Sequence, residues 1–425
     1  MVDIDPTAEL YGVGFKPKDK RPNKTDDKME ILRKAAGIRD TPNIIDLVKE
    51  ADRTKNDIIK KQPPGMWKDE KTIVDINLYE IPVVHIKLTT DQAQGVRKDP
   101  NVEYVVIPPK AHIMAEEIPW GISRVGADQV DATVRHRGYG VSVGIIDSGM
   151  DYNHTDLKPN YKGGWSFLTN TDDPMDDNNL APDGKTKDEV YHGTHVSGTV
   201  GAAINNFGVV GVAPEVFLYA AKTQDASGNG DYATITEAVI WTTQNNFQVI
   251  NMSLGGTGTY PALADAVKKA HDSNCFVACS SGNDSKLQVN YPAGYPGAWA
   301  TGAVDDTDTL ASFSSWGPVG YVDFTCPGVN ILSDQKGNRF HTLQGTSMAS
   351  PHTAGMAALA MANYRFSPCD TNTYDTKFKK IDHVVGAMIS SCDTLGQTSP
   401  GVQSQKYGYG MPQVSQILSI LTGGS

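Results

Sequence analysis

The chain has 425 residues, and 39 % of them are hydrophobic, so it can bury a large core and exceeds one minimal domain. Its net charge of −11 is uneven: residues 1–114 hold 20 Lys and Arg against 19 Asp and Glu, and the remainder holds 18 against 30. An acidic body argues against binding to nucleic acid or to an anionic membrane. No apolar run is long enough to cross a bilayer, and the first five residues lack the basic and then apolar pattern of a signal peptide.

The first 114 residues predict a small α+β module. Residues 43–59 have apolar side chains at helical spacing, and residues 72–78 and 83–88 have the composition of strands. A short polar helix should follow, and residues 102–107 are expected to form the last strand of the module.

From about residue 139, short apolar runs alternate with helical stretches. The expected strands are residues 141–146, 216–221, 249–254 and 276–280, and the expected helices are residues 196–203, 235–243 and 262–270. Because strands buried on both faces read as continuous apolar runs, this alternation predicts an α/β fold with a parallel sheet. Functional sites in such folds lie beyond the carboxyl ends of the strands.

Two polar residues stand at the starts of turns or helices in this region. Asp147 ends the first strand, where a rigid and partly desolvated carboxylate can orient an imidazole, although an aspartate there is also common in turns. His192 begins a helix among glycine and small residues. His192 and His195 could also be structural residues or metal ligands, but the glutamate of a His-Glu-x-x-His motif is missing. We interpret His192 as a general base and His195 as a packing residue.

Residues 345–352 place Ser347 among small residues, directly before an alanine-rich helical run. Proline is tolerated in the first turn of a helix, so Pro351 predicts that Ser347 lies at a helix N-terminus, where free N–H groups favour negative charge. Asn283 follows the strand at residues 276–280, and its amide could donate to an oxyanion. A Gly-Asn pair is otherwise an ordinary turn.

A family resemblance is carried by three stretches, residues 143–149, 192–198 and 345–352. Their candidate residues follow one another in the order Asp, His, Ser, which is the order in subtilisin. From about residue 119 to residue 421, the chain resembles the subtilisin family of serine endopeptidases. The resemblance implies a three-layer α/β fold with a mainly parallel central sheet. It also implies a catalytic set in which Asp147 orients His192, His192 activates Ser347, and Asn283 stabilises the oxyanion.

The resemblance further implies a groove that binds an extended polypeptide. The expected substrate-binding residues are Gly228, Asn229, Gly230, Tyr232, Ser253, Leu254, Gly255, Ser280, Ser281, Gly282, Asp284 and Asn290. For Tyr232 and Leu254, ordinary loop packing is the alternative. Asn290 stands where many relatives have glycine, so we expect a shorter or more polar primary pocket.

A structural calcium ion is also implied, with Glu116, Asp156 and Asn206 among its ligands. The segment at residues 206–211 looks one residue shorter than the common form of the family's calcium loop. A plain Asn-Asn turn is therefore the alternative interpretation of Asn206.

Residues 85–114 resemble the end of the family's propeptide. We therefore expect a propeptide domain at residues 1–114, with an insertion near residues 19–43, and a catalytic domain at residues 115–425. The module would act as an intramolecular inhibitor and folding chaperone of a self-processing zymogen that cuts itself between Met114 and Ala115. The resemblance implies a secreted or extracytoplasmic monomer that acts on polypeptides.

Two questions stay open at this level. Cys369 and Cys392 flank a polar loop and could form a disulfide, which would imply an oxidising compartment, but sequence alone does not decide the pairing. A transpeptidase or macrocyclase would use the same acyl-enzyme, and a catalytically silent binding module could share the fold. All four expected catalytic positions are intact, which favours the hydrolase.

Overall fold

The computed structural model describes residues 9–15, 83–88, 90–100, 102–106, 116–130, 136–176, 191–318, 320–365, 380–395 and 399–422. The chain divides into two compact units, Met1–Ile113 and Met114–Ser425. Within the described residues, no helix is both long and apolar enough to span a membrane.

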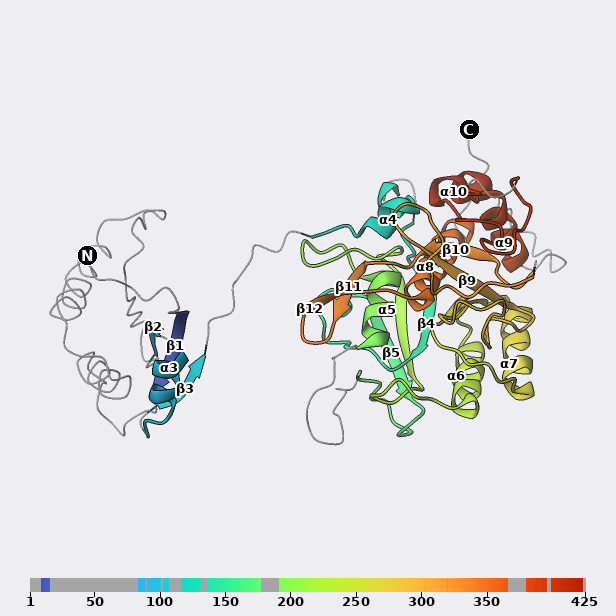
Figure 1. Ribbon diagram of the computed structural model, residues 1–425. Coiled ribbons are helices and arrows are strands. Elements are labelled where there is room, and N and C mark those ends of the chain that lie inside the picture. The colour runs from blue at the N-terminus through green and yellow to red at the C-terminus, as the bar shows by residue number, and fades with distance from the viewer. Residues whose placement is uncertain are drawn as a thin grey trace. The chain divides into compact units, whose positions relative to one another are not determined.

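The described part of the first unit is a three-stranded antiparallel sheet with one helix (Figure 1). Its elements are β1 (Glu9–Phe15), β2 (Val83–Leu88), α3 (Thr90–Arg97) and β3 (Val102–Val106). The predicted strands at residues 83–88 and 102–107 and the short helix between them are confirmed, whereas the predicted helix at 43–59 and strand at 72–78 lie outside the described residues. Strand β1 pairs with both β2 and β3 and was missed, because Gly12 and Gly14 weaken its strand signal.

The second unit is built on a seven-stranded sheet with the order β10-β9-β8-β7-β4-β6-β5, in which every described pair is parallel. The strands are β4 (Ser142–Asp147), β5 (Tyr161–Ser166), β6 (Phe217–Lys222), β7 (Val249–Met252), β8 (Phe276–Ser280), β9 (Ala298–Val304) and β10 (Phe324–Pro327). The prediction of a parallel α/β sheet is therefore confirmed. A separate antiparallel hairpin consists of β11 (Ile331–Gln335) and β12 (Arg339–Leu343).

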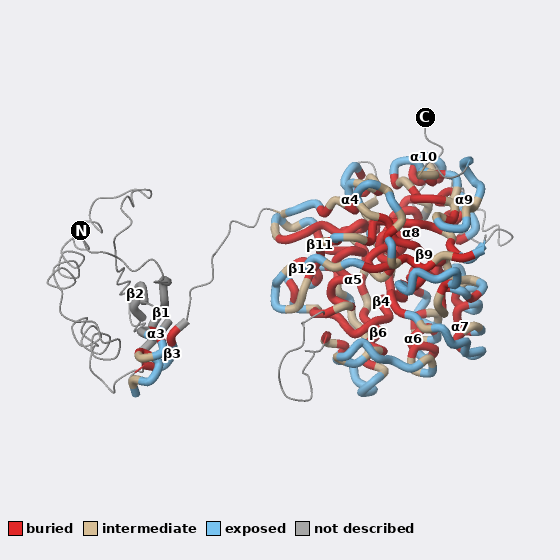
Figure 2. Tube along the Cα trace, in the orientation of Figure 1, coloured by how far each residue is buried: buried red, intermediate tan, exposed pale blue. Residues whose placement is uncertain are grey.

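Helices cover both faces of this sheet, which gives three layers (Figures 1 and 2). Along β8, Phe276 and Ala278 belong to the larger core cluster, and Val277 and Cys279 belong to the smaller one. Successive side chains of a strand point to opposite faces, so one strand supplies both cores. The helices of this unit are α4 (Trp120–Arg124), the 3₁₀ turn η1 (Ala127–Gln129), α5 (His192–Gly201), α6 (Tyr232–Gln244), α7 (Pro261–Asp272), α8 (Thr346–Arg365), α9 (Lys380–Ser390) and α10 (Val414–Thr422).

The strand order reverses around β4. From β4 the chain runs to β5 and β6 on one side, and then returns to β7 on the other side. A crevice forms at the carboxyl end of strands where the connections diverge in this way. Asp147 is the last residue of β4 and thus lies at this switch point.

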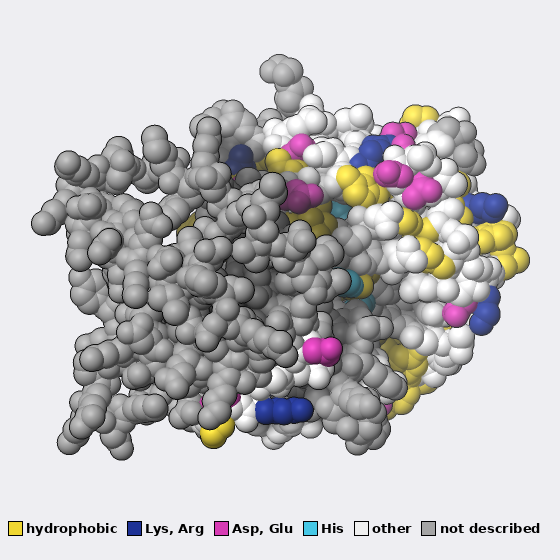
Figure 3. Space-filling view, turned by 60° about the vertical axis from the view of Figure 1, so that its left-hand side comes forward, with side chains coloured by type: hydrophobic (Ala, Val, Ile, Leu, Met, Phe, Trp, Pro, Cys, Tyr) yellow, Lys and Arg dark blue, Asp and Glu magenta, His cyan; other side chains and the backbone are white. Residues whose placement is uncertain are grey.

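The face seen in Figure 3 carries hydrophobic side chains in small, scattered groups among polar and charged ones. Isolated exposed apolar side chains are normal for a protein surface. The described part of this face therefore has no broad apolar patch that would indicate a docking surface.

Candidate active site

Asp147 and His192 are hydrogen-bonded to each other at the switch point. Asp147 is fully buried at the end of β4, and His192 is the first residue of α5. Nδ1 of His192 donates to Oδ1 of Asp147 at 2.8 Å, and the N–H of Ser148 donates to the same oxygen at 2.7 Å. This contact fixes the tautomer of His192 with the proton on Nδ1, so Nε2 is free to act as a base.

The environment of His192 stabilises its charged form. Burial alone lowers the pKa of His192, but the charge of Asp147 and its hydrogen bond more than offset that effect, so the pKa is raised above its ordinary value. Proton transfer from a hydroxyl requires a base that is neutral at first and is stabilised once it is protonated.

A second buried carboxylate, Asp176, ties the turn after β4 to the start of α5. Oγ of Ser148 donates to Asp176 Oδ1 at 2.9 Å, and the N–H and Oγ1 of Thr194 donate to Asp176 Oδ2 at 2.9 and 2.6 Å. Burial raises the pKa of Asp176. Sequence reasoning missed Asp176, because no strand or motif precedes it and only the fold brings it to His192.

Ser347 lies at the start of α8, as predicted, but the reason involving Pro351 was wrong. The helix begins at Thr346, so Pro351 is its sixth residue and lies beyond the first turn. A proline there leaves the carbonyl four residues earlier, that of Ser347, without its helical N–H donor. Oγ of Ser253 donates to this carbonyl at 2.8 Å and replaces the missing bond.

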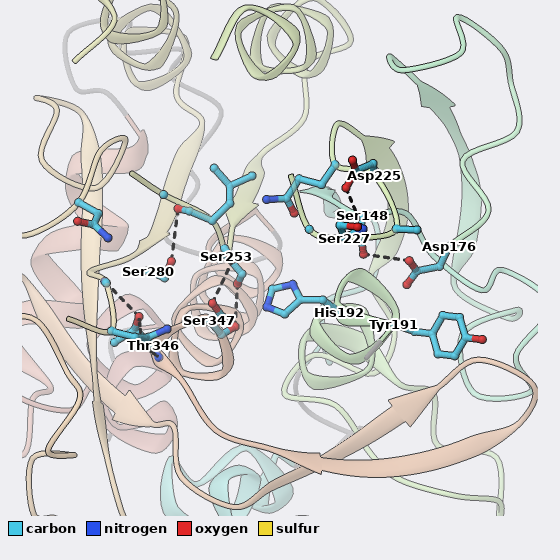
Figure 4. A pocket seen from close by; sticks show the side chains of 18 residues that line it. Ser148, Asp176, Tyr191, His192, Asp225, Ser227, Ser253, Ser280, Thr346 and Ser347 are labelled. Carbon is cyan, nitrogen blue, oxygen red and sulfur yellow. Dashed lines mark hydrogen bonds between the residues drawn. The ribbon is translucent and has the colours of Figure 1, made fainter. Parts of the chain in front are cut away.

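The hydroxyl of Ser347 donates to the carbonyl oxygen of Ser253 at 3.1 Å. Figure 4 shows His192 and Ser347 lining the same pocket, with Ser148 and Asp176 beyond His192 as seen from Ser347. A nucleophile and its base often tighten their hydrogen bond only when substrate is bound. The arrangement therefore places a hydroxyl beside an imidazole whose other nitrogen is held by a carboxylate.

Asn283 is anchored by its oxygen, which leaves its nitrogen available. The N–H and Oγ1 of Thr346 both donate to Oδ1 of Asn283 at 2.9 Å. With its oxygen held by Thr346, the amide has Nδ2 as its remaining donor, and Asn283 lines the same pocket as Ser347. An amide donor in this place can stabilise a negative charge that develops beside Ser347.

The pocket has a volume of about 480 Å³, which suits a side chain or short peptide segment. Seven of the twelve predicted substrate-binding residues line it: Gly228, Ser253, Leu254, Gly255, Ser280, Gly282 and Asn290. Asn229, Gly230, Tyr232, Ser281 and Asp284 are not among its lining residues. The pocket also involves Tyr191, Gln224, Asp225, Ala226 and Ser227, which sequence reasoning missed because they lie in loops without a motif.

Asn290 narrows one end of this pocket. Its Nδ2 donates to Oδ2 of Asp284 at 3.4 Å, a long bond, and a Cβ placed on Gly282 would lie 2.7 Å from the same nitrogen. Gly282 has a φ of 114°, a conformation that favours glycine. The amide of Asn290 therefore fills space that a glycine at residue 290 would leave open.

The predicted calcium ligands lie around one loop. Oε1 of Glu116 accepts hydrogen bonds from the N–H groups of Asn205 and Asn206, at 2.6 and 3.0 Å. Oδ1 of Asp156 accepts from Nδ2 of Asn205 at 3.0 Å, and Oδ2 accepts from the N–H of Val209 at 2.9 Å. Calcium needs six to eight oxygens that face one point. These oxygens accept hydrogen bonds from N–H groups here, and a carboxylate oxygen has a second lone pair, so calcium binding by Glu116, Asp156 and Asn206 stays a prediction.

None of the four described cysteines lines the pocket. Cys275, Cys279, Cys326 and Cys392 are buried free thiols, and burial raises the pKa of each. Thiols in such surroundings are inert. Cys369, the proposed partner of Cys392, lies outside the described residues, as do Met114 and Ala115.

Comparison with known proteins identifies the class that this fold and site define. A model of the subtilase family matches residues 138–410. The chain is 39 % identical over 289 residues to a thermostable alkaline protease from Halalkalibacterium halodurans, with 67 % of this chain and 74 % of that protein covered. It is 41 % identical over 273 residues to subtilisin E from Bacillus subtilis, covering 63 % and 68 % of the two chains. Subtilisin DY from Bacillus licheniformis is 44 % identical over 254 residues, covering 59 % and 86 %.

The chain therefore belongs to the subtilase family, and it is a subtilisin-type serine endopeptidase. The family resemblance of residues 143–149, 192–198 and 345–352 is thereby confirmed.

Proposed function

We propose that this protein hydrolyses peptide bonds in polypeptides through an acyl-enzyme on Ser347. The observation that carries the proposal is the 2.8 Å bond between Asp147 and His192 at one wall of the pocket that Ser347 also lines. His192 takes the proton of the Ser347 hydroxyl as its oxygen attacks the carbonyl carbon, and the resulting imidazolium is stabilised by Asp147. His192 then returns the proton to the leaving amine.

Asn283 and the N–H of Ser347 are the proposed donors to the tetrahedral oxyanion. The anchored oxygen of Asn283 holds its amide in place before the reaction, so no reorganisation is needed when the charge forms. Water then attacks the acyl-enzyme with His192 as its base, which releases the acid and restores Ser347.

A peptide in extended conformation is the proposed ligand of the groove. Residues 226–228 and 253–255 line the pocket, and an extended peptide can bond to the backbone of such segments as an added strand. The narrowed end at Asn290 favours medium-sized residues over large aromatic ones on the acyl side of the cut.

The test is covalent labelling with a serine-directed organophosphate, followed by peptide mapping, in the parent and in Ser347→Ala. We expect one label, on Ser347, together with loss of cleavage of an unfolded protein substrate. A parent that takes no label would contradict the proposal and favour a silent binding module. Products joined to an added amine, in excess over hydrolysed products, would instead indicate a transpeptidase.

We also propose that residues 1–114 are a propeptide and that the bond between Met114 and Ala115 is cut by the enzyme itself. The resemblance of residues 85–114 to the family's propeptide supports this, as does a compact first unit that ends at Ile113. Intact mass of purified parent and Ser347→Ala is the test. A Ser347→Ala chain that is cut at the same bond in a protease-deficient host would contradict self-processing.

Two further properties are proposed from family membership alone. Secretion, with action as a monomer, is expected for a self-processing protease of this family. Calcium binding is general in the subtilase family, and for this chain it stays a prediction, since the described contacts of Glu116 and Asp156 are with N–H groups. Calorimetric titration of the chelated protein with calcium tests it.

A further inference from the structure

Two carboxylates line the substrate pocket, those of Asp176 and Asp225, and none of its described lining residues is a lysine or an arginine. Asp176 is buried, and both of its oxygens accept hydrogen bonds from Ser148 or Thr194. Asp225 is exposed. A charged group of a bound polypeptide can therefore reach the carboxylate of Asp225, whereas that of Asp176 is enclosed by the protein.

The carboxylate of Asp225 is held in place by its own loop. The N–H groups of Ser227 and Asn229 donate to Oδ1 at 2.8 and 3.0 Å. Two backbone bonds of 2.9 Å close the loop, from the N–H of Gly228 to the carbonyl of Asp225 and from the N–H of Asp225 to the carbonyl of Asn229. Among the residues that the structure describes, Oδ2 of Asp225 has no hydrogen bond or salt bridge. One oxygen thus fixes the carboxylate, and the other is available to a ligand.

A second loop of the same form begins at Asp305 and lies outside the pocket. Oδ1 of Asp305 accepts from the N–H groups of Thr307 and Thr309, both at 3.0 Å, and the N–H of Asp305 donates to the carbonyl of Thr309 at 3.0 Å. An aspartate can therefore stand at such a position for the turn alone. Because the two loops differ in whether they face the pocket, Asp305 is a matched control for Asp225.

The place of Asp225 indicates which residue of a substrate it faces. Figure 4 shows Thr346 on one side of Ser347 and Asp225 on the other. The end of the pocket that Asn290 narrows is on the Thr346 side, because the N–H of Gly282 donates to Oγ1 of Thr346 at 3.1 Å. Successive side chains of an extended peptide point in opposite directions. When the residue before the cut enters the Asn290 end, the second residue before the cut therefore points toward Asp225.

An ion pair with Asp225 has favourable conditions for a surface contact. Exposed pairs usually contribute little, partly because two mobile side chains must be ordered. The carboxylate of Asp225 is already fixed by the loop, so only the side chain of the ligand loses freedom. Charge at longer range acts in the same direction, because residues 115–425 hold 18 Lys and Arg against 30 Asp and Glu and so attract cationic peptides.

We propose that Asp225 binds the ammonium or guanidinium group of a lysine or arginine at the second residue before the cut. The preferred substrates are then cationic segments of polypeptides. This inference rests on the proposed hydrolysis and names its substrate class. Asp225 determines specificity and takes no part in breaking the bond, so cleavage of a peptide that is neutral at this position should not depend on its charge.

The experiment uses the active protein produced from the full chain, and three peptides of equal length. The first has lysine at the second residue before the cut and norleucine three residues further away, the second has norleucine at both positions, and the third exchanges the lysine and norleucine of the first. The first and third peptides have the same composition and charge, so long-range attraction acts on both. The kcat/KM of each peptide is measured for the parent, Asp225→Asn and Asp305→Asn, at low and high salt.

We expect the parent and Asp305→Asn to cleave the first peptide with a kcat/KM about fivefold above that of the third, and Asp225→Asn to cleave the two equally. The preference should shrink at high salt, because an exposed ion pair is screened. The second peptide should be cleaved equally by all three proteins. Equal kcat/KM for the first and third peptides in the parent would overturn the proposal, and so would a preference that persists in Asp225→Asn.

Failure of the proposed hydrolysis would give a different result. A parent that cleaves none of the peptides contradicts the hydrolysis, and fluorescence anisotropy then compares the affinities of the parent and the two variants for the same labelled peptides. Equal affinity of the parent for the first and third peptides would overturn the role of Asp225. If Asp225→Asn also fails on the second peptide because its loop is disturbed, the salt series of the parent decides, and a preference that salt does not reduce would overturn the proposal.

Discussion

Ser253 and Ser347 exchange two hydrogen bonds: the Ser253 hydroxyl donates to the Ser347 carbonyl at 2.8 Å, and the Ser347 hydroxyl donates to the Ser253 carbonyl at 3.1 Å. The first bond replaces the helical bond that Pro351 cannot make. The loop after β7 therefore holds the first turn of α8, and with it the nucleophile, at the edge of the pocket.

The first prediction tests that replacement. Ser253→Ala should lower the free energy of unfolding by about 1–3 kcal/mol, because the carbonyl of Ser347 loses its donor. In a Pro351→Ala background the loss should be smaller, since residue 351 then supplies an N–H to the same carbonyl. Urea unfolding of the four proteins in a Ser347→Ala background gives the coupling energy. Strictly additive effects would contradict the account.

The second prediction concerns the pH dependence of activity. His192 must be neutral to act as a base, and its pKa lies above the ordinary 6.5, so kcat/KM should rise with pH through a midpoint above that value. Asp147→Asn should lower this midpoint and reduce kcat about 10⁴-fold, because the tautomer of His192 is no longer held. A parent midpoint below 6.5 would rule out this role for Asp147.

The third prediction separates the two ends of the Asn283 amide. Asn283→Asp keeps an oxygen that can accept from Thr346 but removes the Nδ2 donor, whereas Asn283→Ala removes both. Both variants should lose roughly 10²–10³-fold in kcat with little change in KM, because the donor acts on the transition state. Near-normal kcat in Asn283→Asp would exclude Asn283 from the oxyanion hole.

A fourth prediction concerns selectivity. Asn290→Gly removes the amide that lies against Gly282, so the pocket should accept large aromatic residues. We expect kcat/KM for peptides with Phe or Tyr before the cut to gain about tenfold relative to peptides with Met or Leu. An unchanged ratio in a matched peptide series would place Asn290 outside the primary pocket.

The fifth prediction concerns stability rather than catalysis. Burial raises the pKa of Asp323 to about 7 from 3.8, so the folded protein binds a proton there that the unfolded chain releases. The contribution of Asp323 to the free energy of unfolding is largest below pH 3.8 and is lost as the pH rises through 7. Between pH 3.8 and pH 7, the free energy of unfolding of the parent should fall by up to about 4 kcal/mol more than that of Asp323→Asn. Parallel pH profiles of urea unfolding in the two proteins would contradict this.

Local patterns were enough for four of the seven strands of the sheet and for the start of α8, whereas β5, β9 and β10 were not predicted. The strands β4, β6, β7 and β8 were predicted because their apolar runs are short and continuous. Strand β1 was missed because glycines interrupt its pattern, and it is a strand through its pairing with β2 and β3. The position of Ser347 was predicted correctly from a wrong reason, since the bond that makes Pro351 tolerable comes from Ser253, 94 residues earlier.

The sequence by itself determined the parallel sheet and the family, because both depend on residues that are close together in the chain. For the same reason it determined the candidates for the catalytic set, which are Asp147, His192, Asn283 and Ser347. Only the tertiary structure placed Asp176 behind His192, set Asn290 against Gly282, and buried Asp334 beside His154. These contacts join segments that are far apart in sequence. Their energies depend on burial and on which donors are in reach, and neither quantity is local.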